Sequence, residues 1–69
     1  TSVGVGTTSP TSKLHIDGTA GEQLRIANSF TPTGSGDTTA GDTGDIAWDD
    51  DYFYVKTSAG WKRAALSTF

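Results

Sequence analysis

The sequence predicts an all-β protein that associates with further copies of itself, and three observations support this. Apolar residues occur in short runs with the two-residue period of strands, and the Thr, Gly and Asp between them disfavour helices. Five of the seven aromatic residues lie between positions 48 and 61. The chain has 69 residues, 33% of them hydrophobic, so it cannot bury enough apolar area to offset about 1.5 kcal/mol of ordering entropy per residue.

Composition leaves oligomerisation as the remaining source of stability. The chain has no cysteine, and a single histidine leaves only carboxylates to complete a zinc site. No stretch approaches the roughly 18 apolar residues of a membrane span, and no leader resembles a signal peptide. A net charge of -3 argues against binding to nucleic acid or to an anionic membrane. The start at Thr1 and the absence of Met indicate an excised or processed piece. No cofactor is expected.

Residues 1–28 are predicted to form an extended β segment. Val3 and Val5 alternate with glycine, and Pro10 then favours a turn. Residues 13–16 and 23–26 repeat the pattern polar, Leu, polar, Ile, and each copy has the period of a strand. The two strands pair either within one chain or with neighbouring copies in an intertwined fibre.

Residues 29–44 are predicted to be a Gly/Thr-rich linker or extended segment. Phe30 is almost the only residue here with apolar area to bury. The composition suits a free linker, and it equally suits an extended segment packed against two copies of itself.

Residues 45–69 are predicted to form a three-stranded antiparallel meander. Strands are expected at 45–48, 52–57 and 61–66, with turns at 49–51 and 58–60. The second turn is the better specified, because a three-residue loop ending in Gly60 suits a type I turn closed by a left-handed residue.

Both faces of this meander are expected to be largely apolar. With Thr57 opposite Trp61, one face carries Ile46, Trp48, Tyr52, Tyr54, Ala64 and Leu66. The other face carries Ala47, Phe53, Val55, Trp61 and Ala65. This register sets Lys56 against Lys62, so either carboxylates intervene or the register is shifted by one residue. Because two or three strands alone are marginal in water and a lone sheet normally leaves one face wet, association is expected.

Two parts of the chain resemble bacteriophage fibres. Residues Val3 to Ile16 resemble a tail-fibre shaft repeat, a Gly-hydrophobic-Gly-Thr-Thr-Ser-Pro run that leads to Lys-Leu-His and a β-branched residue. The end of the chain resembles the foldon, the trimerisation domain of phage fibritin, through Tyr54-Val55, Trp61 and the final Leu-Ser-Thr-Phe. The segment after Trp61 is two residues longer than in the foldon, and a strand through Trp48 stands in place of a proline-bearing lead-in.

The resemblance implies an intertwined homotrimer in the tail fibre of a virion, with a foldon-like hairpin from each chain. Its role would be structural: registering three chains and locking the end of the upstream fibre shaft. Burial of the aromatic hairpins would then make folding and trimerisation one event. The residues expected at the trimer interface are Ile46, Trp48, Tyr52, Tyr54, Val55, Trp61 and Leu66.

Other chemistry is less well supported by the sequence. Asp49, Asp50 and Asp51 are weak candidates for a metal site, since a trimer could gather several carboxylates, but Asp is also favoured in turns and the EF-hand spacing is absent. An enzyme is not expected, because the lone His15, expected on the surface, has no fixed acidic partner for a triad.

The alternative function is a receptor-binding fibre tip. Exposed aromatic rings and neighbouring Asp residues would engage a host cell-surface glycan. The same aromatic residues are explained more simply as the core of an interface.

Overall fold

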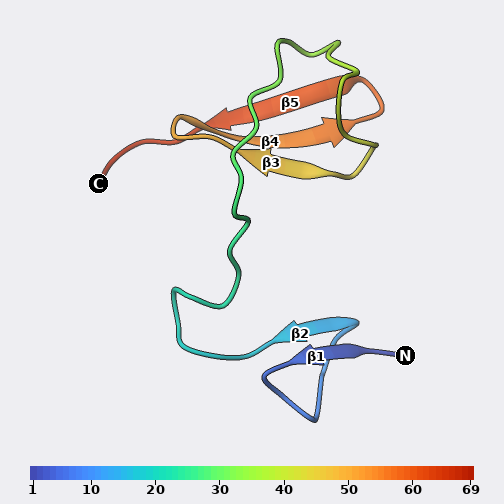
Figure 1. Cartoon of the computed structure of the whole chain (residues 1–69), viewed down its shortest axis with the longest axis vertical. Coiled ribbons are helices and arrows are strands. Elements are labelled where there is room, and N and C mark those ends of the chain that lie inside the picture. The colour runs from blue at the N-terminus through green and yellow to red at the C-terminus, as the bar shows by residue number, and fades with distance from the viewer.

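The computed structural model describes residues 1–69 and confirms the all-β class, with five strands and no helix (Figure 1). β1 (Val3–Val5) and β2 (Leu14–Ile16) form a parallel pair. β3 (Ile46–Trp48), β4 (Tyr52–Thr57) and β5 (Gly60–Ala65) form an antiparallel sheet in that order, so the predicted meander is confirmed. No helix suited to crossing a membrane is present.

The predicted strand at residues 23–26 is not formed in the single chain. β2 pairs with β1 instead, with Val3 opposite Leu14, and Leu24 remains 69% exposed. The chain runs on to the larger sheet, where the carbonyl of Ile26 accepts a hydrogen bond from Nε1 of Trp48 at 2.8 Å. The alternation at residues 23–26 therefore marks extended chain that lacks a pairing partner.

Both hairpins of the meander are shifted by one residue from the predicted register. Lys56 lies opposite Trp61, and Phe53 lies opposite Trp48. Gly60 has the expected positive φ, at 105°, but it pairs with Thr57 as the first residue of β5. Only two residues remain in the loop, and neither has positive φ, which matches a type I turn followed by a glycine bulge.

This shift resolves the conflict between the two lysines. Lys56 now faces Trp61, while Lys62 lies opposite Val55, so the like charges occupy opposite faces of the sheet. Of the two explanations that the sequence allowed, the shifted register is confirmed.

The molecule is extended for its length. Its two sheets make no contact with each other (Figure 1). The radius of gyration is 14.8 Å, compared with about 11 Å for a compact domain of this size. Only four of the 69 residues are buried. All the buried hydrophobic residues belong to the C-terminal sheet, which therefore holds the core.

Candidate association surface

The inner face of the C-terminal sheet carries the core of the chain. Ala47, Tyr54 and Trp61 are its buried hydrophobic residues. The Trp61 ring lies 5.8 Å from the ring of Phe30 and 6.5 Å from that of Tyr54, which it meets edge-on. These separations lie in the range where aromatic pairs attract one another. The core is thus a small aromatic cluster to which residue 30 contributes from outside the sheet.

Residues 30–44 cover this inner face, and we call them the wrapped loop (Figure 1). Phe30 N–H donates to the Trp48 carbonyl at 3.0 Å, and Trp61 N–H donates to the Ser35 carbonyl at 2.9 Å. These two bonds join the wrapped loop to β3 at one edge of the sheet and to β5 at the other. Its return is fixed by Gly44 N–H, which donates to the carbonyl of residue 56 at 2.8 Å. The sequence predicted a linker or extended segment here and missed this packing, for which Phe30 was the available signal.

Asp37 holds the wrapped loop in shape. Its carboxylate accepts N–H groups of Thr33 at 2.9 Å and Thr39 at 2.8 Å, and the Thr39 hydroxyl at 2.6 Å. These bonds, led by the Thr39 hydroxyl, lower the pKa of Asp37 to about 2. The Asp37 carbonyl accepts a bond from Nζ of Lys56 at 2.9 Å, and the same ammonium lies 5.5 Å from the Trp61 ring centroid. Asp37 therefore connects the loop to the sheet and to the core.

Asp49 closes the turn between β3 and β4. Its Oδ1 accepts the N–H groups of Asp51 and Tyr52 at 2.8 Å each, and its Oδ2 accepts the hydroxyls of Thr31 at 2.6 Å and Tyr54 at 2.5 Å. The hydroxyl of Thr31 first, and then that of Tyr54, hold the pKa of Asp49 far below its ordinary value. The bond to Asp49 likewise raises the pKa of Tyr54. The carboxylate thus uses about all of its four acceptor positions within the chain.

The three weak metal candidates do not converge on a common point. No group of three or more histidine or acidic side chains lies close enough to hold an ion. Asp49 serves the turn chemistry described above, while Asp50 and Asp51 are exposed. His15 is half-buried, and its Nδ1 accepts the N–H of Thr11 at 3.1 Å within the β1–β2 connection.

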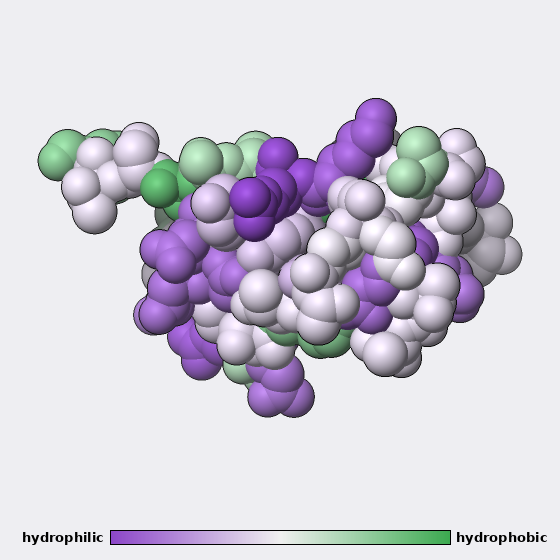
Figure 2. All heavy atoms as spheres, turned by 90° about the horizontal axis from the view of Figure 1, so that it is seen from above, coloured by the Kyte–Doolittle hydropathy of each residue, from purple (hydrophilic) through white to green (hydrophobic).

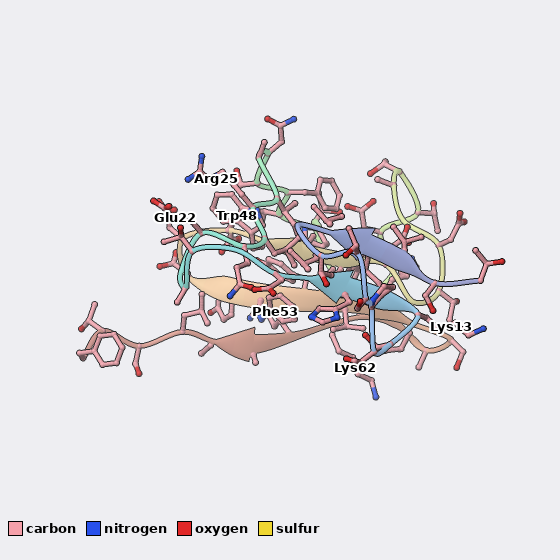
Figure 3. The ribbon with its side chains drawn as sticks, turned by 90° about the horizontal axis from the view of Figure 1, so that it is seen from below. Lys13, Glu22, Arg25, Trp48, Phe53 and Lys62 are labelled. Atoms are coloured by element: carbon pink, nitrogen blue, oxygen red, sulfur yellow. The ribbon has the colours of Figure 1, made fainter.

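The opposite side of the C-terminal sheet, which we call the outer face, is apolar and largely uncovered. Ile46 lies opposite Val55 and is 46% exposed, while Phe53 lies opposite Trp48 and is 41% exposed. Figure 3 shows Trp48, Phe53 and Lys62, which come from the three successive strands and share this face. Large exposed apolar side chains held in neighbouring positions on a sheet are typical of an interaction surface.

The predicted division of side chains between the two faces is wrong. The inner face carries Ala47, Tyr52, Tyr54, Trp61 and Ala65. The outer face carries Ile46, Trp48, Phe53, Val55 and Ala64. The cause is the one-residue shift in both hairpins, because a slip of one residue moves the side chains of a whole strand to the other face.

The residues expected at a trimer interface consequently divide into two groups. Tyr54 and Trp61 are only 3% and 6% exposed in the single chain, so a partner would add little to their burial. Tyr52 is also on the inner face, with the guanidinium of Arg63 4.1 Å from its ring centroid. The outer group has surface available for a partner: Ile46, Trp48, Val55 and, beyond the end of β5, Leu66. Contact between chains at these residues stays a prediction.

The comparisons with known proteins add no relative to this picture. No protein-family model, curated protein or solved structure matches the chain.

Proposed function

We propose that this chain is a structural trimerisation module, which registers three chains and locks the end of a phage or phage-like tail fibre. The observation that carries the proposal is the surface that a single chain leaves uncovered. One chain exposes 5552 Å², whereas a compact monomer of its mass exposes about 4,100 Å². Part of this additional exposed area belongs to the large apolar side chains of the outer face.

The size of the excess suits a three-fold ring. About 1,400 Å² per chain corresponds to two patches of about 700 Å², close to the roughly 800 Å² that each partner buries in a standard interface. Each protomer of a ring presents two such patches, one to each neighbour. The number three is supported further by the resemblance of the hairpin to the fibritin foldon.

The N-terminal pair of strands supports a place beside a fibre shaft. Val3, Val5 and Leu14 are exposed although they lie in strands, and a two-stranded sheet is marginal in water. Neighbouring chains of a shaft would cover these side chains. The resemblance of Val3 to Ile16 to a shaft repeat supports the same position in the virion.

The mass of the protein in solution tests this proposal. Light scattering or sedimentation equilibrium at tens of micromolar should give three times the 7.2 kDa of one chain. Phe53→Ser should raise the dissociation constant about tenfold or more, because burying a Phe side chain is worth about 1.5–3 kcal/mol. Ser58→Ala, in the exposed hairpin turn, is the matched control and should leave the mass unchanged. A wild-type mass of one chain at these concentrations would overturn the proposal.

A second candidate is a fibre tip that binds host glycan. It is favoured by one observation, the exposed ring of Phe53 beside Trp48 on the outer face. Stacking of a pyranose on this pair would be tested with a glycan array. Binding that is lost in Phe53→Ala, while the assembly keeps its mass, would support the second candidate over the first.

A further inference from the structure

The last four residues, Leu66–Phe69, form a tail that stands away from the sheet (Figures 1 and 2). The tail leaves the body at a fixed place, because Leu66 N–H donates to the Asp51 carbonyl at 2.8 Å. Leu66 is 55% exposed and the side chain of Phe69 is fully exposed. Two large apolar side chains thus project into solvent from a segment whose first residue is anchored.

A hollow of about 450 Å³ lies beside the aromatic core. Its hydrophobic lining comes from the extended chain before the wrapped loop, from the wrapped loop itself and from the sheet: Ile26, Phe30, Ala40, Ile46, Ala47 and Trp61. A dry cavity of about 150 Å³ is enough to hold benzene, so the space accommodates a phenyl ring with adjoining backbone.

The tail of the same chain is poorly placed to fill this hollow. Trp61 stands near the start of β5, whereas the tail begins after Ala65 at its end. Four residues of strand separate the two points by about 13 Å, and the tail continues away from the sheet (Figure 1). An occupant of this chemistry is therefore better supplied by a second copy.

We propose that the tail of one protomer docks into the hollow of the next. In this contact the Phe69 ring enters the hollow and packs beside Phe30. The contact is head-to-tail, and three such contacts close a ring when successive copies are related by a three-fold rotation. The inference rests on the proposed function, because it requires neighbouring copies, and it names the segment that joins them.

Disulfide trapping tests the contact directly, because the chain has no cysteine of its own. Ala40→Cys places a thiol at the exposed rim of the hollow, and Thr68→Cys places one in the tail without removing Phe69. Equal amounts of the two variants are mixed, allowed to exchange subunits and oxidised. The mixed covalent dimer, identified by mass, should form several-fold more than in a control that pairs Ala40→Cys with Ser58→Cys. A yield no higher than in the control would overturn the docking.

A second variant separates this inference from the proposed function. Phe69→Ser should raise the dissociation constant of the assembly about tenfold or more, with an unchanged circular dichroism spectrum because the side chain is fully exposed in one chain. Ser67→Ala is the control and should keep wild-type affinity. A wild-type trimer whose affinity Phe69→Ser leaves unchanged would overturn tail docking alone. A wild-type protein that stays monomeric would overturn both.

Discussion

At the scale of single residues, Gly60 and Gly44 share a backbone conformation but differ in their surroundings. Both have positive φ, at 105° and 99°. A Cβ at Gly60 would lie 2.1 Å from the carbonyl oxygen of Ser35, whereas nothing lies within 4 Å of one at Gly44. The pair therefore separates the cost of backbone strain from the cost of a collision.

We expect Gly60→Ala to destabilise the sheet more than Gly44→Ala. Gly44→Ala should lower the free energy of unfolding by about 1–2 kcal/mol, the cost of a left-handed non-glycine residue. Gly60→Ala has this cost and also displaces Ser35, whose carbonyl accepts the N–H of Trp61. Urea unfolding measures both changes, and equal losses would contradict the close packing of the wrapped loop on β5.

Asp37 makes stability depend on pH in a defined direction. Its pKa falls from 3.8 to about 2 on folding, so the unfolded chain binds the proton more tightly. Its stabilising contribution is therefore fully present above the unfolded value and is lost as the pH falls through 3.8 towards about 2. Asp49, with its pKa also lowered, acts in the same direction.

Asp37→Asn tests this dependence. The midpoint of urea unfolding should fall less steeply between pH 4 and pH 2 in the variant than in the wild type, because one group that takes up a proton on unfolding is gone. Asp50→Asn makes the same change of formal charge at an exposed position. If both variants had identical pH profiles, the hydrogen bonds of Asp37 would not be the cause.

At the scale of elements, the strand positions and strand order of the meander could be predicted from the sequence, and the register could not. The alternation and the turn residues located all three strands of the meander to within one residue. Register depends on whether Gly60 counts as loop or as strand, and the pattern of residue types is compatible with either. The signal that favoured the observed answer was electrostatic, since the other register set Lys56 against Lys62.

The two sheets should fold independently of each other. Because they make no contact, deletion of residues 1–20 should leave β3, β4 and β5 intact while retaining Ile26, the acceptor for Trp48. The near-ultraviolet circular dichroism of the aromatic core should match that of the full chain. A large loss of this signal would contradict the independence of the two sheets. Deletion of residues 1–34 is the comparison, and it should lose the signal because it removes Phe30.

The candidate site could be predicted only in part, because the packing of the wrapped loop on the sheet was missed. The sequence predicted that the aromatic residues form an interface between chains, and the structure places Tyr54 and Trp61 in a core within one chain. The sequence did not predict that the wrapped loop buries Tyr54 and Trp61. The loop is held mainly by backbone hydrogen bonds and by Asp37. The composition of this segment alone indicates only a linker. The Asp37 and Thr39 pair within a Gly-rich run was the local sign of an ordered loop.

At the scale of the whole molecule, stability should depend on protein concentration. If the outer face is covered only in the assembly, unfolding releases free chains and the equilibrium follows mass action. The midpoint of thermal unfolding should therefore rise steadily over a hundredfold increase in concentration. A midpoint independent of concentration, with a reversible transition, would indicate that the single chain is the stable unit.

The wrapped loop also decides how much of this chain can be transplanted. A fusion that carries only residues 45–69 would contain every strand of the C-terminal sheet. It would lack Phe30, which packs on the Trp61 ring, the Ser35 carbonyl, which accepts the Trp61 N–H, and Asp37, which accepts a bond from Lys56. Such a graft would expose the indole to water on one side and leave the outer face apolar on the other. A fusion partner made from this chain should therefore begin near residue 23, so that it includes the wrapped loop.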